Sequence, residues 1–377
     1  MPSLREKLKA IKPSAAPSAT RPVPQDCFVR ETRFPFDMYT VLPDGLLSFM
    51  QGDEEIPEHI SPEHILFLDT ETTGLSRGTG TVAFLVGVGM IRDKELIVKQ
   101  YLMRDYDEEY YVLKHVQRDL DDCDVLVTYN GRAFDMPLLA SRFIMQRMHV
   151  DTDVPHADLL HTARRVWKLR LKNCSLSYLE ELIFHDPRED DIPGAEIPGR
   201  YFDYLKHHDF SLLEDILHHN ALDIFSLARL LYTLSDLHQD PMHAEHLQDI
   251  FSLGRIFDKR GRSETARTCY RAADAGSMSA MSRLFLAANL RRARQPEEAA
   301  KIYRKMIASG QGGAQPYIAL CKILEHQMND IPSALDTAKR GLIMLSDVPA
   351  SDPAIQAAFD DLTKRYARLM RKSRPHD

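Results

Sequence analysis

The clearest pattern in the chain is a run of four apolar residues, 65–68 (Ile-Leu-Phe-Leu), that ends in the acidic sequence Asp69-Thr70-Glu71. An apolar run of this length, bounded by polar residues, predicts a central β-strand covered on both faces. Asp69 and Glu71 are two residues apart, so on a continuing strand both side chains leave by the same face. Carboxylates this close repel each other unless a cation lies between them, and the pair therefore suggests a divalent-metal site. A solvated strand end is the alternative interpretation.

After this pair the chain alternates between short apolar strands and amphipathic helices. Further strands are expected over residues 81–90, 95–101 and 124–129, with a hairpin turn at 92–94. Helices are expected over residues 107–120, 135–147, 159–167, 175–183 and 212–234, and an irregular loop over 191–199. Asp158 either ends another strand or caps a helix, and residues 27–62 give no strong period. This order predicts an α/β fold in which helices flank a mixed sheet.

The strand signal ends near residue 246, and pairs of amphipathic helices follow. Ala266, Ala299 and Ala334 are spaced 33 and then 35 residues apart at positions where helices would cross. A period near ~34 residues is typical of tetratricopeptide repeats, although a generic helical bundle is the alternative. Asp352 and Pro353 begin a final capping helix. We therefore expect a proline-rich flexible leader over 1–26, an α/β domain over 27–240 and helical repeats over 246–371.

Composition limits the classes of function. The 377 residues carry a formal net charge of −7, so nucleic acid would have to be bound by local basic patches. The most basic segment contains Arg164, Arg165 and Lys168 around Trp167, and it either contacts phosphates or forms a solvated helix face. No apolar run approaches the ~20 residues that span a membrane. The five cysteines are scattered and lack C-x-x-C pairs, which favours a cytoplasmic location.

Two later segments add acidic residues to the first pair. Asp135 follows the strand expected at 124–129 and begins the next helix, where it could also serve only as an N-cap. His219 and Asp223 are four residues apart on a long helix and share one face. Each residue alone fits a boundary position better than a functional site. The three elements in this order and spacing, however, seldom arise by chance.

Together these elements resemble the DEDD exonucleases of the ribonuclease H-like superfamily. Residues 69–74 match the first motif of that group, and Asn130, Phe134 and Asp135 match the second. The third motif of the group has a tyrosine four residues, or a histidine five residues, before its aspartate. This chain has His219 four residues and His218 five residues before Asp223, so the motif leaves the general base open between them.

A closer resemblance, to YprB-type ribonuclease H-like proteins, covers roughly residues 26–234. It rests on residues 67–75, 78–87, 158–161, 174–176, 191–194 and 219–223. In that branch a His-Asn pair precedes the aspartate at the four-residue spacing, which favours His219 over His218. The resemblance implies a ribonuclease H-like fold with a mixed five-stranded sheet flanked by helices. It also implies helical repeats after the nuclease domain.

The resemblance further implies hydrolysis with two Mg²⁺ or Mn²⁺ ions. By analogy Asp69 bridges both ions, Glu71 and Asp223 complete the first site, and Asp135 holds the second. His219 would accept a proton from the attacking water. The candidate substrate contacts are Thr70, Thr72, Asn130, Phe134, Arg164, Arg165 and Lys168.

The function expected from these residues is 3′-5′ exonuclease action on single-stranded or frayed nucleic acid, either DNA or RNA. Two alternatives remain. One is a scaffold that binds nucleic acid without cutting and recruits protein partners through the repeats, and the other is a structure-specific endonuclease. Hydrolysis requires that the four carboxylates converge and that no Lys or Arg fills the pocket between them.

Overall fold

The computed structural model describes residues 25–38, 42–51, 61–74, 80–149, 154–188, 191–346 and 352–373. The leader expected over residues 1–26 lies outside these ranges except for its last two residues. Residues 75–79, which span the junction of the matching stretches 67–75 and 78–87, also lie outside the described ranges. In the described part of the chain, no helix is both long enough and apolar enough to cross a membrane.

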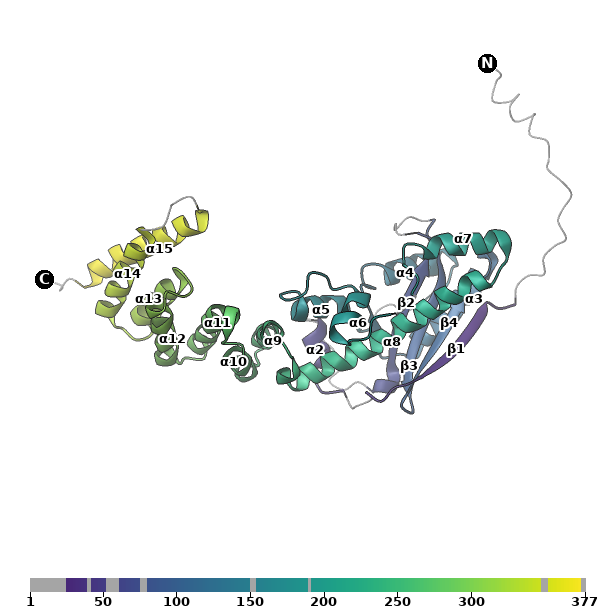
Figure 1. Cartoon of the computed structure of the whole chain (residues 1–377), viewed down its shortest axis with the longest axis horizontal. Coiled ribbons are helices and arrows are strands. Elements are labelled where there is room, and N and C mark those ends of the chain that lie inside the picture. Colours follow the sequence, from purple (N-terminus) through teal and green to yellow (C-terminus); the bar gives the residue numbers. More distant parts are fainter. Residues whose placement is uncertain are drawn as a thin grey trace, which may run out of the picture.

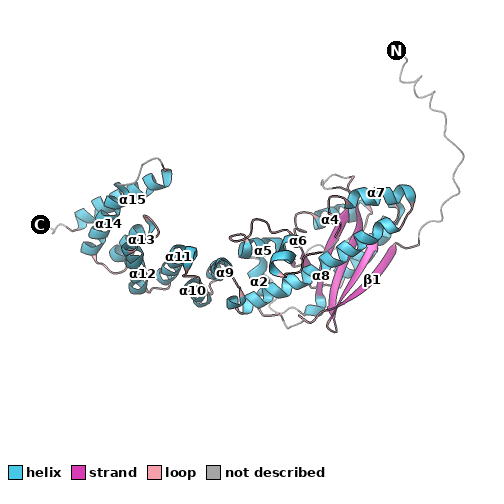
Figure 2. Ribbon diagram, viewed as in Figure 1, coloured by secondary structure: helices cyan, strands magenta, loops and turns pink. Residues whose placement is uncertain are grey.

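A mixed sheet forms the first half of the molecule (Figure 2). Its strands are β1 (Phe28–Pro35), β2 (Ile65–Thr72), β3 (Ala83–Arg92), β4 (Glu95–Leu102), β5 (Val125–Thr128) and β6 (His156–Asp158). Their order is β1-β4-β3-β2-β5-β6. The fold class expected from the sequence is confirmed, but among the described residues the sheet has six strands instead of five. The additional strand, β1, pairs antiparallel with β4 along the edge of the sheet and has no buried residue, which explains its weak apolar pattern.

β2 lies in the middle of the sheet, as its apolar run predicts. It pairs antiparallel with β3, where Asp69 is opposite Gly87, and parallel with β5, where Ile65 is opposite Val125. Successive residues of β2 enter two different apolar cores, because side chains alternate between the faces of a strand. Ile65 and Phe67 belong to the core under helix α8 (Ser211–Gln239), and Leu66 belongs to the core under helix α3 (Glu109–Asp121).

The expected hairpin between β3 and β4 is confirmed. Asp93 and Lys94 have positive φ angles of 51° and 63°, the backbone conformation that suits a tight hairpin turn. The parallel pairing of β2, β5 and β6 brings the carboxyl ends of these strands to one edge of the sheet. The residues that follow those ends are therefore neighbours in space.

Helices cover both faces of the sheet. Besides α3 and α8 they are α2 (Leu46–Gln51), α4 (Asp135–Met145), α5 (Leu159–Trp167), α6 (Leu176–Ile183) and α7 (Ile197–His207). Figure 1 shows α8 as a long helix that crosses the sheet from end to end. Its continuous apolar face, which includes Leu213, Ile224 and Leu227, is fully buried.

Three local expectations need correction. Helix α2 lies in the segment that gives no strong period, and α7 begins at Ile197, inside the stretch predicted as a loop. The second helix position of α7 is Pro198, and proline is compatible with the first turn of a helix because no backbone N–H is needed there. Ser175 precedes α6 as expected, but its side chain makes no capping bond and instead accepts a hydrogen bond from Asn173.

The second half of the described chain is helical. Its helices are α9 (Leu247–Lys259), α10 (Ser263–Ala272), α11 (Ser279–Arg292), α12 (Pro296–Ala308), α13 (Gln315–His326), α14 (Ile331–Ser346) and α15 (Pro353–Lys372). They form a row that leads away from the sheet (Figure 1). Ala266, Ala299 and Ala334 are fully buried on the second helix of successive pairs. Asp352 caps α15 by accepting a hydrogen bond from the backbone of Ala354, as predicted.

Candidate active site

The first carboxylate of β2 is bound by α8. Asp69 accepts a hydrogen bond from the side-chain amide of Asn220 at 3.0 Å, and the oxygen of that amide accepts one from Gln100 at 3.0 Å. Gly87, opposite Asp69 on β3, leaves the space that Asn220 occupies, because a Cβ there would lie 2.2 Å from its Oδ1. These contacts fix the rotation of α8 over the sheet and so determine which of its residues face β2.

Glu71, His219 and Asp223 form a compact group next to Asp69. His219 Nε2 lies 3.8 Å from Glu71 Oε1 and 3.4 Å from Asp223 Oδ2. Each residue can offer one ligand atom such that the three atoms lie within 4.8 Å of one another, a spacing that could hold a metal ion. The other ring nitrogen of His219, Nδ1, lies 2.8 Å from Asp191 Oδ1. Asp191 therefore orients the imidazole so that Nε2 faces the carboxylates.

Asp135 approaches from the other face of the sheet. It is the first residue of α4, is 9% exposed, and accepts a hydrogen bond from the hydroxyl of Thr70 on β2. Burial raises its pKa to about 6. Asp158, at the end of β6, caps α5 and accepts hydrogen bonds from the backbone of Leu160 at 3.1 Å and of Asn130 at 2.8 Å. The interpretation of Asp158 as a structural cap agrees with these contacts.

One cavity of about 580 Å³ receives all four carboxylates: Asp69, Glu71, Asp135 and Asp223. Burial first, and then the charges of the other three carboxylates, raises the pKa of Asp69 well above its usual value. Burial and the charges of Asp223 and Asp135 do the same to Glu71. Such shifts mean that negative charge is concentrated here beyond what the surroundings neutralise. Carboxylate oxygens are the donors that Mg²⁺ and Mn²⁺ prefer, so the donor set fits a divalent metal.

A basic residue does approach the acidic group. The guanidinium of Arg188 lies 2.5 Å from Asp223 Oδ1 and 3.0 Å from Asp191 Oδ2, and two of its nitrogens bind Glu180 on α6 at 2.6 Å. The acidic group therefore has a basic neighbour. Arg188 does not line the cavity, however, and it contacts only one of the four proposed ligands. Among the described residues, Asp69 and Asp135 make no ion pair.

The remaining predicted residues fall into two places. Thr70, Thr72, Phe134 and His219 line the cavity with the carboxylates, and the Phe134 side chain is 45% exposed there. Asn130 has a positive φ of 65° and donates its backbone N–H to Asp158. His218 is exposed and does not line the cavity. Arg164, Arg165 and Lys168 lie at a separate groove between α5 and α9.

Sequence reasoning gave no role to several residues that shape the site. Asp191 and Arg188 lie near or in a loop, and Arg142 of α4 lines the cavity while Glu109 binds its guanidinium at 2.7 Å. For Asp191 a signal existed, since residues 191–194 belong to the motif that supports the closer resemblance. For Arg188 and Arg142 the role depends on partners that only the fold brings near.

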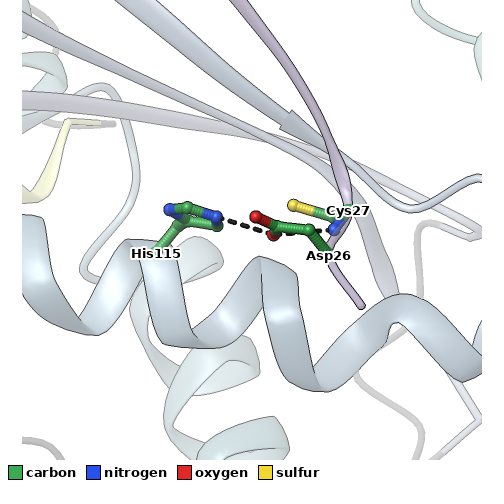
Figure 3. Close-up of side chains that lie close together, drawn as sticks. All are labelled: Asp26, Cys27 and His115. Atoms are coloured by element: carbon green, nitrogen blue, oxygen red, sulfur yellow. Dashed lines mark hydrogen bonds and ion pairs between the residues drawn. The ribbon is translucent and has the colours of Figure 1, made fainter. Parts of the chain in front are cut away.

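A second group of potential ligands lies at the start of β1. Figure 3 shows His115 of α3 bonded to Asp26, with the thiol of Cys27 beside them; His115 Nε2 and Asp26 Oδ1 are 2.9 Å apart. Burial, together with the charges of Asp26 and Glu108, raises the pKa of Cys27 to about 12. The thiolate that metal binding or nucleophilic attack requires is thus disfavoured. We interpret this group as a structural link between β1 and α3.

Comparisons with known proteins concern the family of the chain. A family model described as the RNase_H superfamily matches residues 66–235. The uncharacterized protein YprB of Bacillus subtilis (strain 168) is 30% identical over 369 residues, which cover 92% of this chain and 86% of YprB. A family B DNA polymerase from the archaeon Pyrobaculum calidifontis is similar with a TM-score of 0.38 and 16% identity. That match covers 58% of this chain and 30% of the polymerase.

The fold and the match define a ribonuclease H-like protein. The chain belongs to the ribonuclease H superfamily, in the family of YprB. Membership of this superfamily supports a nuclease that binds nucleic acid, and nucleases of this superfamily generally use divalent metals. The acidic cavity is the place where the described residues offer a set of ligands for such a metal.

Proposed function

We propose that this protein is a metal-dependent 3′-5′ exonuclease that hydrolyses phosphodiester bonds of single-stranded nucleic acid. The observation that carries the proposal is the convergence of four carboxylates, from β2, α4 and α8, on one cavity. The pKa values of Asp69 and Glu71, raised by burial and by the charges of neighbouring carboxylates, are the electrostatic mark of a site that a cation would complete. Family membership supports the same conclusion.

The proposed ligands are Asp69, Glu71, Asp135 and Asp223. Bound Mg²⁺ or Mn²⁺ would supply a Lewis acid that lowers the pKa of a bound water and offsets charge on the scissile phosphate. The chain holds these ligands through other contacts. Asn220 orients Asp69, and the hydroxyl of Thr70 orients Asp135.

His219 is the proposed general base. Its Nδ1–H donates to Asp191, and this bond leaves Nε2 as the acceptor that faces the carboxylates of the cavity. A water placed between Nε2 and the phosphate would lose its proton to Nε2 as its oxygen bonds to phosphorus. The bond from phosphorus to the leaving 3′ oxygen would break in the same displacement, and that oxygen would take up a proton from solvent. Asp191 stabilises the imidazolium that results, the part that a carboxylate plays behind a catalytic histidine. Asp191 is therefore a positioning residue.

The wall of the cavity is suited to a nucleotide. The exposed ring of Phe134 offers a flat apolar surface on which a base could stack, and stacking of this kind tolerates any sequence. Leu138 and Met145 of α4 extend the same apolar wall. Thr72 donates its hydroxyl to the carbonyl of Gly74 and so shapes the end of β2. We assign Phe134, Thr70 and Thr72 to the nucleotide at the reactive end.

Arg188 is compatible with this assignment. It occupies only Oδ1 of Asp223, while Oδ2 faces His219 Nε2 within the ligand group. The buried carboxylate of Glu180 forms a second ion pair with the same guanidinium. A charged Arg188 opposes the rise in pKa that burial gives Asp223 and keeps that ligand closer to its ionised form. Ionised carboxylate is the form that binds a metal.

We infer that the helix pairs α9–α10, α11–α12 and α13–α14 are tetratricopeptide-like repeats over residues 246–371, after a nuclease domain over 27–240. The buried alanines at the 33- and 35-residue spacing support the repeats. The apolar core under α8 continues without interruption into these helices. A repeat array attached rigidly to the nuclease is suited to guide substrate or to dock a protein partner.

The test is incubation of the pure protein with end-labelled DNA and RNA oligonucleotides, in Mn²⁺, in Mg²⁺ or in chelator. The proposal predicts metal-dependent release of mononucleotides from linear substrates with a free 3′ end. Cutting of circular or 3′-blocked substrates at an equal rate would show an endonuclease instead. Binding without any cutting in either metal would show a non-catalytic scaffold and refute the proposed chemistry.

A further inference from the structure

A second groove lies where the first helix of the repeat region meets the sheet-bearing part of the chain. Its volume is about 660 Å³, and its walls are α5 and α9. Six basic residues line it: Arg164, Arg165, Lys168, Arg255, Lys259 and Arg260. No acidic side chain of the described residues lines it. The chain as a whole carries a net charge of −7, so this cluster of positive charge differs in sign from the protein's overall charge.

Four of these side chains are exposed on two facing helices. Arg164 and Lys168 are four residues apart at the end of α5, and Arg255 and Lys259 are four residues apart on α9; all four are exposed. Residues at this spacing lie on one face of a helix, so each helix presents a pair. Within the described ranges, none of the four is ion-paired with a carboxylate.

The two walls are held rigidly against each other. Arg170, just beyond α5, binds the buried carboxylate of Asp249 on α9 at 2.8 Å. Arg165 donates to the backbone carbonyls of Phe49 and Met50 at the end of α2, which anchors α5 from below. Burial and then the charge of Arg260 lower the pKa of Arg165, in accord with an excess of positive charge. The basic side chains are thus carried by two helices that are fixed relative to each other, and such a preorganised arrangement suits the binding of an anion.

The groove is connected to the acidic cavity through α5. That helix is capped at its start by Asp158, whose charge contributes to the raised pKa of Asp135. At ~1.5 Å per residue, Arg164 and Lys168 lie roughly 9 and 15 Å along the helix from Asp158. One strand of a nucleic acid advances by ~3.4 Å per nucleotide, so these side chains are ~3–5 nucleotides from the reactive end.

We propose that this α5–α9 groove binds the phosphate backbone of the nucleic acid strand whose end lies in the acidic cavity. The proposal rests on the proposed function for the direction of the strand. It assigns a substrate contact to Arg255 and Lys259, which lie outside the matched ribonuclease H region. Backbone contacts of this kind are independent of sequence and position the strand for reaction. The repeat region thereby extends the nuclease site instead of serving only a separate partner.

The experiment measures binding in chelator, where no hydrolysis occurs, by fluorescence anisotropy of oligonucleotides of about 20 and about 2 nucleotides. The variants are Arg255→Glu/Lys259→Glu and the control Lys301→Glu/Lys305→Glu, an exposed pair at the same spacing on α12. For the longer strand, the slope of log affinity against log salt should fall in magnitude by about 1.4, or ~0.7 per lost phosphate contact. Binding of the short strand and of both strands by the control variant should match that of the unchanged protein.

Equal slopes for the Arg255/Lys259 variant and the unchanged protein would overturn the proposal, as would an equal loss for long and short strands. If charge reversal unfolds the chain, as thermal melting would show, Arg255→Gln/Lys259→Gln removes the same two contacts and carries the same expectation. Because binding is measured in chelator, the two proposals can fail separately. If the protein shows no hydrolysis in metal but shows the change in slope, the nuclease proposal fails and the groove proposal stands. If it hydrolyses nucleic acid but the slopes are equal, the groove proposal fails and the nuclease proposal stands.

Discussion

The side-chain amide of Asn220 donates a hydrogen bond to Asp69 across 151 positions of sequence, at 3.0 Å. This bond joins α8 to the end of β2, and it lies beside Gly87, a position of β3 that has no side chain. The metal-binding geometry that we propose depends on this fit, because His219 directly precedes Asn220 on α8 and Asp223 lies about one turn further on. The fit also makes the first prediction possible.

Replacement of Gly87 by alanine should weaken both the fold and the site. The new Cβ would lie 2.2 Å from Asn220 Oδ1, so Asn220 or the whole of α8 must move. Overpacking of this kind costs about 1–3 kcal/mol of unfolding free energy, measurable by urea denaturation. Gly199→Ala on α7, where no atom lies within 4 Å of the new Cβ, is the matched control and should cost little. A Gly87→Ala variant with unchanged stability and activity would contradict the geometry.

Metal should stabilise the protein in a pH-dependent manner. In the metal-free protein the pKa of Asp135 is about 6, above its usual value of 3.8. The folded state therefore binds more protons than the unfolded state across this window, and the contribution of Asp135 to stability falls as pH rises through it. A metal needs the ionised form, so its stabilising effect should grow with pH. At about 100 times its dissociation constant, it should add ~2.7 kcal/mol.

Thermal melting with and without Mn²⁺, at about pH 5.5 and about pH 7.5, measures this effect. Asp135→Asn should flatten the metal-free pH dependence and reduce the gain from Mn²⁺. The exposed Asp107→Asn should change neither. An equal gain from Mn²⁺ in all three proteins would place the metal elsewhere.

His219→Gln should lower the rate constant of hydrolysis by ~10²–10⁴, the usual contribution of a general base. Asp191→Asn should cause a smaller loss, because it only orients the imidazole through Nδ1. His218→Gln should be close to the unchanged protein, since His218 is exposed and does not line the cavity. Single-turnover rates across pH, with substrate binding measured separately, distinguish a lost base from lost affinity. A greater loss from His218→Gln than from His219→Gln would reverse the assignment.

Acid should weaken the junction between α8 and the repeat region. His238 packs between the rings of Phe49 and Phe257, and burial, followed by the charge of Arg262, lowers its pKa from 6.5 to about 4. The folded state thus binds fewer protons than the unfolded state, so the contribution of His238 to stability is present above pH 6.5 and is lost as pH falls toward 4. Urea unfolding at about pH 7 and pH 5 should show a larger loss for the unchanged protein than for His238→Phe. Equal losses would show that His238 is not the group that titrates.

The sequence predicted the centre of the fold better than its edges. β2 was predictable because its four consecutive apolar residues need cover on both faces of a sheet. Asp69 and Glu71 were noticeable because they come directly after this apolar run. β1 was not, since an edge strand with no buried residue leaves a weak alternation in the sequence. The start of α7 was not predicted because Pro198 and Gly199 are typical of loops. Both residues are nevertheless compatible with the first turn of a helix, where they lie in the structure.

The candidate site divides in the same way. Asp69 and Glu71 lie in the last part of β2, Asp135 begins the helix after β5, and His219 and Asp223 share a helix face. These patterns are local. Arg188 takes its role from Glu180, Asp191 and Asp223, which lie up to 35 positions away and meet only when α6, the loop and α8 are packed. No local period encodes such a meeting. Likewise, Arg255 and Lys259 line the same groove as Arg164 and Lys168 only because α9 packs on α5.

The measurement that tests the central claim most directly is the rate of oligonucleotide hydrolysis by Asp69→Asn and Asp223→Asn in Mn²⁺ and in Mg²⁺. Both variants should lose hydrolysis while circular dichroism and melting show a folded chain. The charge of Asp69 is repelled by its neighbours in the metal-free fold, and Arg188 keeps its ion pairs with Glu180 and Asp191 when Asp223 is neutral. Asp107→Asn, prepared in parallel, should cut at the rate of the unchanged protein. Turnover retained by either site variant, or equal turnover in chelator, would contradict metal-dependent hydrolysis at this cavity.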